Sequence, residues 1–110
     1  MGALKAVVPA ALLAFAKPAS AAATANWQPY IAEASARFGI PEPWIRRVIQ
    51  AESGGRATWG GRPIVSHAGA MGLMQLMPPT WAEMRRLHRL GSDPHAPRDN
   101  ILAGTAYLRA

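Results

Sequence analysis

Glu52 is the side chain in this 110-residue sequence whose position best suits acid–base chemistry. It follows Ile45 by seven residues and Ile49 by three, so a helix through this segment places its carboxyl group on the apolar face. Burial raises the pKa of a carboxyl group, which suits a general acid near neutral pH. Cleavage of a glycosidic bond is one reaction that uses such a group. On periodicity alone, a solvent-facing glutamate near a helix end is the ordinary alternative.

Other catalytic and cofactor-binding patterns are weak or absent in the sequence. The histidines, His67, His88 and His95, lack metal-ligand spacing, and there is no cysteine. The Gly-x-Ser-x-Gly pattern of serine hydrolases is missing, and the glycine-rich stretch lacks the ending of a phosphate-binding loop. We therefore expect neither a metal nor a cofactor. Trp59, in a glycine-rich loop, is a candidate either for stacking on a sugar ring or for packing within the loop.

Several short sequence motifs, in a fixed order, resemble those of a known protein family. The motifs are Glu-Ser-Gly at 52–54, Gly-Ala-Met-Gly-Leu-Met-Gln-Leu-Met-Pro at 69–78, Asp-Pro at 93–94 and Asn-Ile-Leu-Ala-Gly-Thr-Ala-Tyr-Leu at 100–108. Together they resemble the soluble lytic transglycosylase family, whose domain is related to goose-type lysozyme, over residues 27–110. The resemblance implies an all-α, lysozyme-like fold in which Glu52 is the sole catalytic residue.

The resemblance also implies which residues line the site. Ser53 is expected to help shape it, and the family's Gly-Leu-Met-Gln word places Gly72, Met74 and Gln75 at the sugar-binding groove. A glutamine amide both donates and accepts hydrogen bonds. A glycine lets the backbone approach a ligand closely, and a methionine offers a flexible apolar surface. Core packing is the alternative for the apolar residues of this stretch, Met74 included.

The activity that the resemblance implies is cleavage of the β-1,4 bond between N-acetylmuramic acid and N-acetylglucosamine in peptidoglycan, with formation of 1,6-anhydromuramic ends. The other acids after the leader fall in no catalytic word of the family, which favours a one-carboxylate mechanism over the usual pair. Two alternatives stay open: a muramidase that admits water, and a non-catalytic peptidoglycan-binding accessory of an envelope secretion or conjugation system. Because the family's domain normally continues past Ala110, the sequence predicts an incomplete domain.

Four helices are predicted to position these residues. The expected helices run from a cap at Asn26 to Phe38, from Pro43 to Ser53, from Pro78, with a capping box over Thr80–Glu83, to Gly91, and from Arg98 or Asp99 onward. Trp27, Trp44 and Trp81 fall on these helices and are expected in the core, while Asn100 is expected to pack the last helix beneath the groove. Residues 54–72 show no helical or strand period and predict a long loop.

The first 25 residues predict a secretory signal peptide, which leaves 26–110 as one domain. Lys5 precedes an apolar run from Ala6 to Ala16, and small residues suited to cleavage end at Ala21 and at Ala25. The run falls short of the roughly 20 residues that a bilayer crossing needs. A membrane anchor is therefore the weaker alternative, and no stable span is expected after cleavage.

The charge of the remaining chain fits an exported protein. From Asn26 onward there are ten arginines and six acids, a net charge of +4. Such a surface favours anionic polymers, although a solubilising charge balance is the plainer alternative. Export removes nucleic acid as a partner and leaves the peptidoglycan of the bacterial envelope. We therefore expect the protein in the periplasm or cell envelope.

Overall fold

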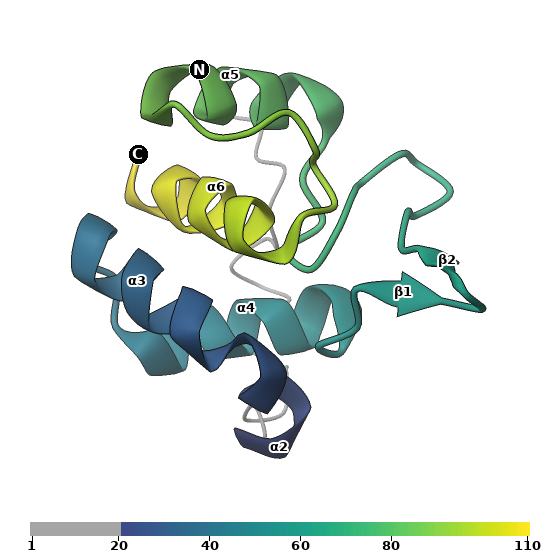
Figure 1. The fold of residues 1–110 in the computed structure, drawn as a ribbon, viewed down its shortest axis with the longest axis horizontal. Helices are drawn as coiled ribbons and strands as arrows, with labels where there is room; N and C mark the ends of the chain where they lie inside the picture. The colour runs from purple at the N-terminus through teal and green to yellow at the C-terminus, as the bar shows by residue number, and fades with distance from the viewer. Residues whose placement is uncertain (1–20) are drawn as a thin grey trace.

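The computed structural model describes residues 21–110, and this part of the chain is mainly helical (Figure 1). The helices are α2 (Ala21–Thr24), the 3-10 turn η1 (Ala25–Trp27), α3 (Gln28–Phe38), α4 (Glu42–Ser53), α5 (Pro78–His88) and α6 (Pro97–Arg109). Two short strands, β1 (Thr58–Trp59) and β2 (Arg62–Pro63), form an antiparallel hairpin in which Trp59 pairs with Arg62. The prediction of a helical domain is confirmed, with the hairpin as a minor addition.

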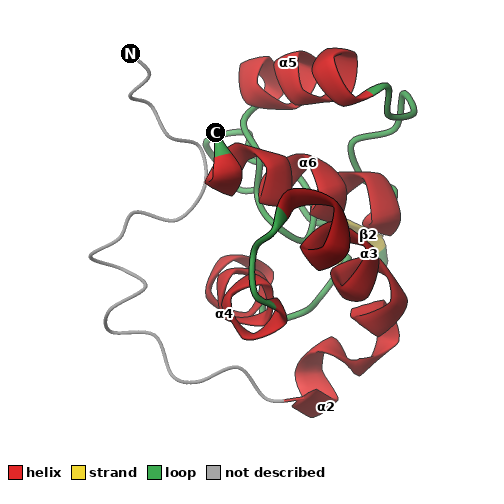
Figure 2. Cartoon of the chain, turned by 90° about the vertical axis from the view of Figure 1, so that its left-hand side faces the viewer, coloured by secondary structure: helices red, strands yellow, loops and turns green. Residues whose placement is uncertain are grey.

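The last helix, α6, lies at the centre of the domain. It packs against α3 on one side and against α5 on the other, as Figures 1 and 2 show. Because both sides are covered, α6 is buried continuously from Asn100 to Ala106. The other helices contribute narrower apolar stripes, such as Ile45, Val48 and Ile49 on α4. None of the helices in residues 21–110 has the length and apolar character of a bilayer-spanning segment.

The two predicted side-chain caps are wrong. The N-cap of α3 is Trp27, because η1 comes first and carries the chain past Asn26 before α3 begins. The N-cap of α5 is Met77, and no side chain caps this helix. The predicted capping box of Thr80 and Glu83 lies inside the helix, since the two prolines ahead of it already form its first turn, where their fixed φ fits.

The third predicted helix also ends earlier than expected. It stops at His88, not at Gly91, because Arg89 adopts a φ of 56° and turns the chain. The backbone N–H of Leu90 then donates to the carbonyl oxygen of Arg85 at 3.0 Å. Leu90 is buried against the core, so the turn at Arg89 that buries this side chain closes the helix before the glycine is reached.

The three helical tryptophans differ in burial. Trp81 is buried, as predicted, and Trp27 is partly buried against the core, with its indole N–H donating to the carbonyl oxygen of Gly55 at 2.8 Å. The prediction that Trp44 lies in the core is wrong, because its side chain is 48% exposed. It sits in the first turn of α4, at the border of the stripe that the core covers.

The end of the predicted leader is ordered against the domain. α2 packs on α4, and Gly55 leaves space for the carbonyl oxygen of Ala23, with which a Cβ at this position would collide. Cleavage after Ala21 would keep this contact, whereas cleavage after Ala25 would remove it. The cleavage site stays a prediction, and the Lys5 and apolar parts of the leader lie outside the described residues.

Candidate active site

Glu52 is the penultimate residue of α4, and its side chain is partly buried, as the helix phase predicts. The helix ends one residue later because Gly54 adopts a φ of 66°, the left-handed conformation that commonly closes a helix. The chain then runs on into the β1–β2 hairpin (Figure 1). The carboxyl group therefore lies at the end of a rigid element, next to the irregular segment that connects α4 to α5.

Burial controls the ionisation of Glu52. Desolvation of the charged form raises the pKa of this carboxyl group to about 8. Within residues 21–110, no hydrogen bond or ion pair to the carboxylate offsets this effect, and no neighbouring charge contributes to the shift. Most Glu52 side chains therefore carry a proton at neutral pH, which is the state that a general acid requires.

Glu52→Gln should stabilise the fold at neutral pH. The pKa of Glu52 has its ordinary value of 4.5 in the unfolded chain and is about 8 in the folded protein. Between these two pH values only the folded state binds the proton, so the free energy of unfolding falls as the pH rises. The neutral glutamine removes this cost. We expect a gain of about 1–3 kcal/mol near pH 8, less than the full shift because the side chain is partly exposed.

Urea unfolding of both proteins at about pH 4 and about pH 8 measures this difference. The gain should be small at the lower pH, where the carboxyl group is protonated in both states, and larger at the higher one. An equal difference at both pH values would contradict the raised pKa.

Ser53 ties the end of α4 to the predicted Gly-Leu-Met-Gln segment. Its hydroxyl is buried and lies 2.8 Å from the carbonyl oxygen of Leu73 and 3.1 Å from that of Ile49. Leu73 belongs to a turn that paired backbone hydrogen bonds between Met71 and Leu76 close. Ser53 thus fixes this turn beside Glu52, a positioning role that agrees with the expectation that it shapes the site. Direct contact of Ser53 with substrate stays a prediction.

Asn100 anchors the same turn to α6. This fully buried amide accepts a hydrogen bond from the N–H of Met74 at 2.7 Å and donates to the carbonyl oxygens of Met71 and Pro94 at 3.0 and 2.9 Å. Gly72 has a φ of 79°, and a Cβ there would collide with the Asn100 side chain. The close backbone approach at Gly72 is therefore made to Asn100, and its approach to a ligand stays a prediction.

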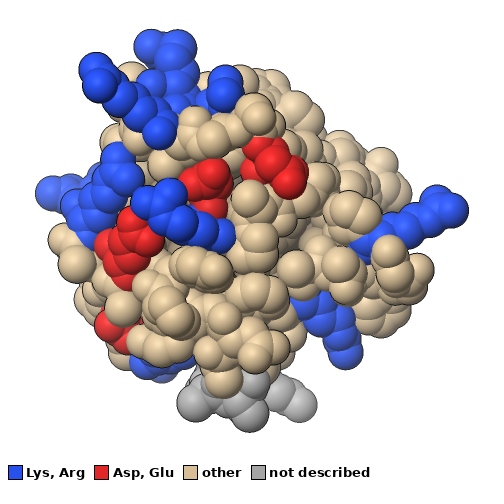
Figure 3. All heavy atoms as spheres, viewed as in Figure 1, with Lys and Arg blue, Asp and Glu red and all other residues tan. Residues whose placement is uncertain are grey.

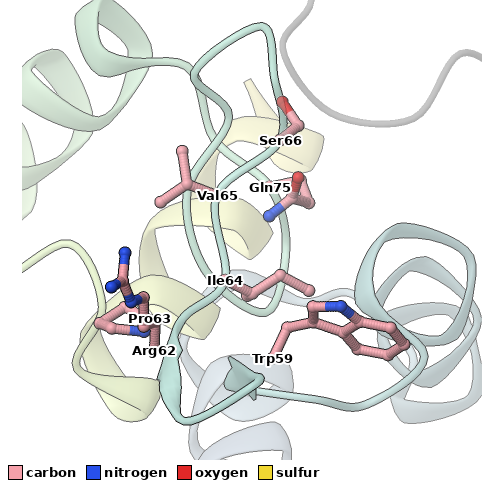
Figure 4. A pocket seen from close by; sticks show the side chains of 7 residues that line it. All are labelled: Trp59, Arg62, Pro63, Ile64, Val65, Ser66 and Gln75. Atoms are coloured by element: carbon pink, nitrogen blue, oxygen red, sulfur yellow. The ribbon is translucent and has the colours of Figure 1, made fainter.

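Gln75 follows in the turn and faces a surface hollow. It adopts a φ of 52°, uncommon for a residue other than glycine, and its side-chain amide donates to the carbonyl oxygen of Gly72 at 2.9 Å. The hollow, of about 480 Å³, is also lined by the β1–β2 hairpin and by residues 64–66 (Figure 4). This bond uses one of the two amide hydrogens, so Gln75 can still offer its oxygen as an acceptor and its second amide hydrogen as a donor.

Met74 lies on the other side of the turn. Its side chain is fully buried, and its sulfur packs against α6 at Gly104, where a Cβ would come within 2.5 Å. The hydroxyl of Thr105 lies 4.0 Å from the same sulfur. This placement supports core packing of Met74 over the predicted sugar contact.

The hairpin contributes one predicted and one unpredicted residue to the hollow. Trp59, the predicted candidate for stacking on a sugar ring or packing within the loop, is 64% exposed and lines the hollow, as do Arg62 and Ile64. Sequence periodicity could not identify Arg62 as a site residue, because the segment around it has neither a helical nor a strand period. For Asn100, the one sequence feature that indicated a role beyond core packing is its polar side chain within the apolar face of the last helix, because a buried amide needs hydrogen-bond partners.

Known proteins resemble this chain over most of its length. The family model for the transglycosylase SLT domain matches residues 29–110. The endo-type membrane-bound lytic murein transglycosylase A of Klebsiella pneumoniae is 38% identical over 89 residues, which cover 76% of this chain and 41% of that protein. The transglycosylase of Enterobacteria phage PRD1 is 37% identical over 85 residues, which cover 76% of this chain and 28% of that protein. The chain thus spans less than half the length of these relatives.

Proposed function

This chain belongs to the family of SLT transglycosylase domains, and we propose that it cleaves the β-1,4 bond between N-acetylmuramic acid and N-acetylglucosamine in peptidoglycan, leaving 1,6-anhydromuramic ends. The observation that carries the proposal is Glu52, a carboxyl group held protonated by burial, at a helix end beside a hollow-lining turn. No other acid in residues 21–110 contributes to its pKa. This isolation favours a mechanism with one carboxyl group over the usual pair.

Glu52 serves as acid and then as base in this mechanism. It first donates its proton to the glycosidic oxygen, and the leaving sugar departs as an alcohol while the substrate's own acetamido oxygen bonds to the anomeric carbon. The Glu52 carboxylate then accepts the proton of the muramic acid 6-hydroxyl. That oxygen attacks the anomeric carbon, displaces the acetamido group and closes the anhydro ring. The carboxyl group is protonated again, and no water is consumed.

The surrounding residues act by positioning. Ser53 holds the turn that carries Gln75 against the end of α4, and the Gln75 oxygen is available to accept a hydrogen bond from a sugar hydroxyl or amide. A fixed turn costs less entropy when substrate binds than a mobile one. We propose further that residues 1–25 export the protein, since the proposed substrate lies in the cell envelope.

Product analysis tests the proposed reaction. Purified peptidoglycan is incubated with the protein, and the released fragments are examined by mass spectrometry. We expect 1,6-anhydromuramic ends, which weigh one water less than reducing ends. New reducing ends would instead identify a hydrolytic muramidase, and co-sedimentation with peptidoglycan without release would identify a non-catalytic binding accessory. Either result would contradict the proposed lyase activity.

A further inference from the structure

The segment between α4 and α5 carries positive charge and no acid. From Ser53 to Ala82 the sequence contains Arg56 and Arg62 but no aspartate or glutamate. On the face seen in Figure 3, the acidic atoms lie over the helices, and the hairpin side at the right shows basic and uncharged atoms alone. The salt bridges within residues 21–110 do not involve either arginine. Their charges therefore remain available to an anionic ligand.

Arg62 lines the hollow beside Gln75, and Arg56 reaches one of its lining residues, Trp59. Figure 4 shows Trp59 and Arg62 on opposite flanks of Ile64. The guanidinium of Arg56 lies 4.9 Å from the centre of the Trp59 ring, a cation–π contact that restrains an otherwise exposed indole. The hollow thus combines an aromatic surface, an apolar floor and a free cation.

This combination fits one form of the proposed substrate better than others. A sugar ring packs its apolar face on an indole, and a guanidinium pairs with a carboxylate. The stem peptide on N-acetylmuramic acid carries free carboxylates, whereas a strand stripped of its peptides retains one carboxylate close to each muramic ring. A cation on the outer flank of the hollow can reach the stem-peptide carboxylates, because the peptides extend away from the glycan strand.

We propose that the β1–β2 hairpin makes this domain prefer glycan strands that carry anionic stem peptides, with Trp59 contacting the sugar and Arg62 pairing with a peptide carboxylate. The inference rests on the proposed function, since it concerns the same substrate. Arg56 acts as a positioning residue through the Trp59 ring. The preference is electrostatic, so it weakens as salt concentration rises.

Binding to three forms of one glycan tests the proposal. The strands carry intact stem peptides, peptides whose carboxyl groups are amidated, or no peptides after amidase treatment. Every protein also carries Glu52→Gln so that no strand is cut. We expect about two- to fivefold tighter binding to the intact form than to either of the others at low salt, the range of an exposed ion pair.

Three arginine variants separate charge from structure. Arg62→Gln should remove the preference and Arg62→Lys should retain most of it, because the lysine keeps the charge. Arg109→Gln is the matched control, since Arg109 is exposed at the end of α6, away from the hairpin (Figure 1), and it should bind as the parent does. Equal affinity for the three strands, or equal losses in Arg62→Gln and Arg109→Gln, would overturn the preference alone. Failure to bind any strand would contradict the proposed function as well.

Discussion

Glu52→Gln should lower the turnover of purified peptidoglycan by about 10²- to 10⁴-fold, the range typical of losing a general acid or base. Glutamine keeps the size of the side chain and most of its hydrogen-bonding capacity but cannot deliver a proton. The substitution also leaves the turn beside it intact, because Ser53 and not Glu52 makes the hydrogen bond to Leu73. Binding of glycan strands should therefore largely survive while release of soluble fragments is lost.

The matched control for this experiment is Glu83→Gln. Glu83 lies exposed on α5, so the substitution makes the same chemical replacement without touching the end of α4. Its turnover should equal that of the parent protein. If Glu52→Gln retains near-normal turnover, the proton donor lies elsewhere and the one-carboxylate mechanism fails with it.

The pH dependence of turnover follows from the same carboxyl group. Burial raises the pKa of Glu52 to about 8, so the protonated acid is available through neutral pH and is lost above that value. The stability gain expected for Glu52→Gln and the loss of turnover then share one cause. A partly buried carboxyl group destabilises the fold when it is charged. The same cost of the charged form keeps the group protonated, so that it can serve as an acid.

The helices were largely predictable because local signals mark their ends. Gly39 and Gly54 end α3 and α4 in the left-handed conformation, and the phase of Ile45 and Ile49 placed Glu52 on a partly buried face. Where a boundary depends on tertiary packing, the local signals failed. Burial of Leu90 ended α5 before the glycine that the sequence indicated.

The site was predictable in outline but not in the direction of its side chains. The sequence word over 72–75 places four residues in a row, yet Met74 points into the core while Gln75 lines the hollow. Positive φ values at Gly72 and Gln75 set these directions, and contacts with Asn100, distant in the sequence, hold the turn in place. The hairpin strands are two residues each, too short to produce a period that a sequence can display.

Asn100→Ala should destabilise the fold by about 3–5 kcal/mol, because it removes three buried hydrogen bonds and leaves two backbone groups without a partner. The N–H of Met74 loses its acceptor and the carbonyl oxygen of Pro94 loses its donor, whereas the carbonyl oxygen of Met71 keeps its hydrogen bond from the N–H of Leu76. The truncated side chain also leaves a cavity beside Gly72, which has no Cβ to fill it. Urea unfolding measures the loss.

Two further asparagine variants make this expectation specific. Asn26→Ala is the matched control: Asn26 is exposed and caps no helix, so stability should stay within about 0.5 kcal/mol of the parent. Asn100→Asp keeps an acceptor for the Met74 N–H, and since burial favours the protonated carboxyl group, it can still donate to one of the two carbonyl oxygens. It should retain part of the stability and remain measurable if the alanine variant does not fold. A loss below about 1 kcal/mol in Asn100→Ala would show that the turn beside Glu52 holds its shape without this amide, and that its hydrogen bonds exchange with water at little cost.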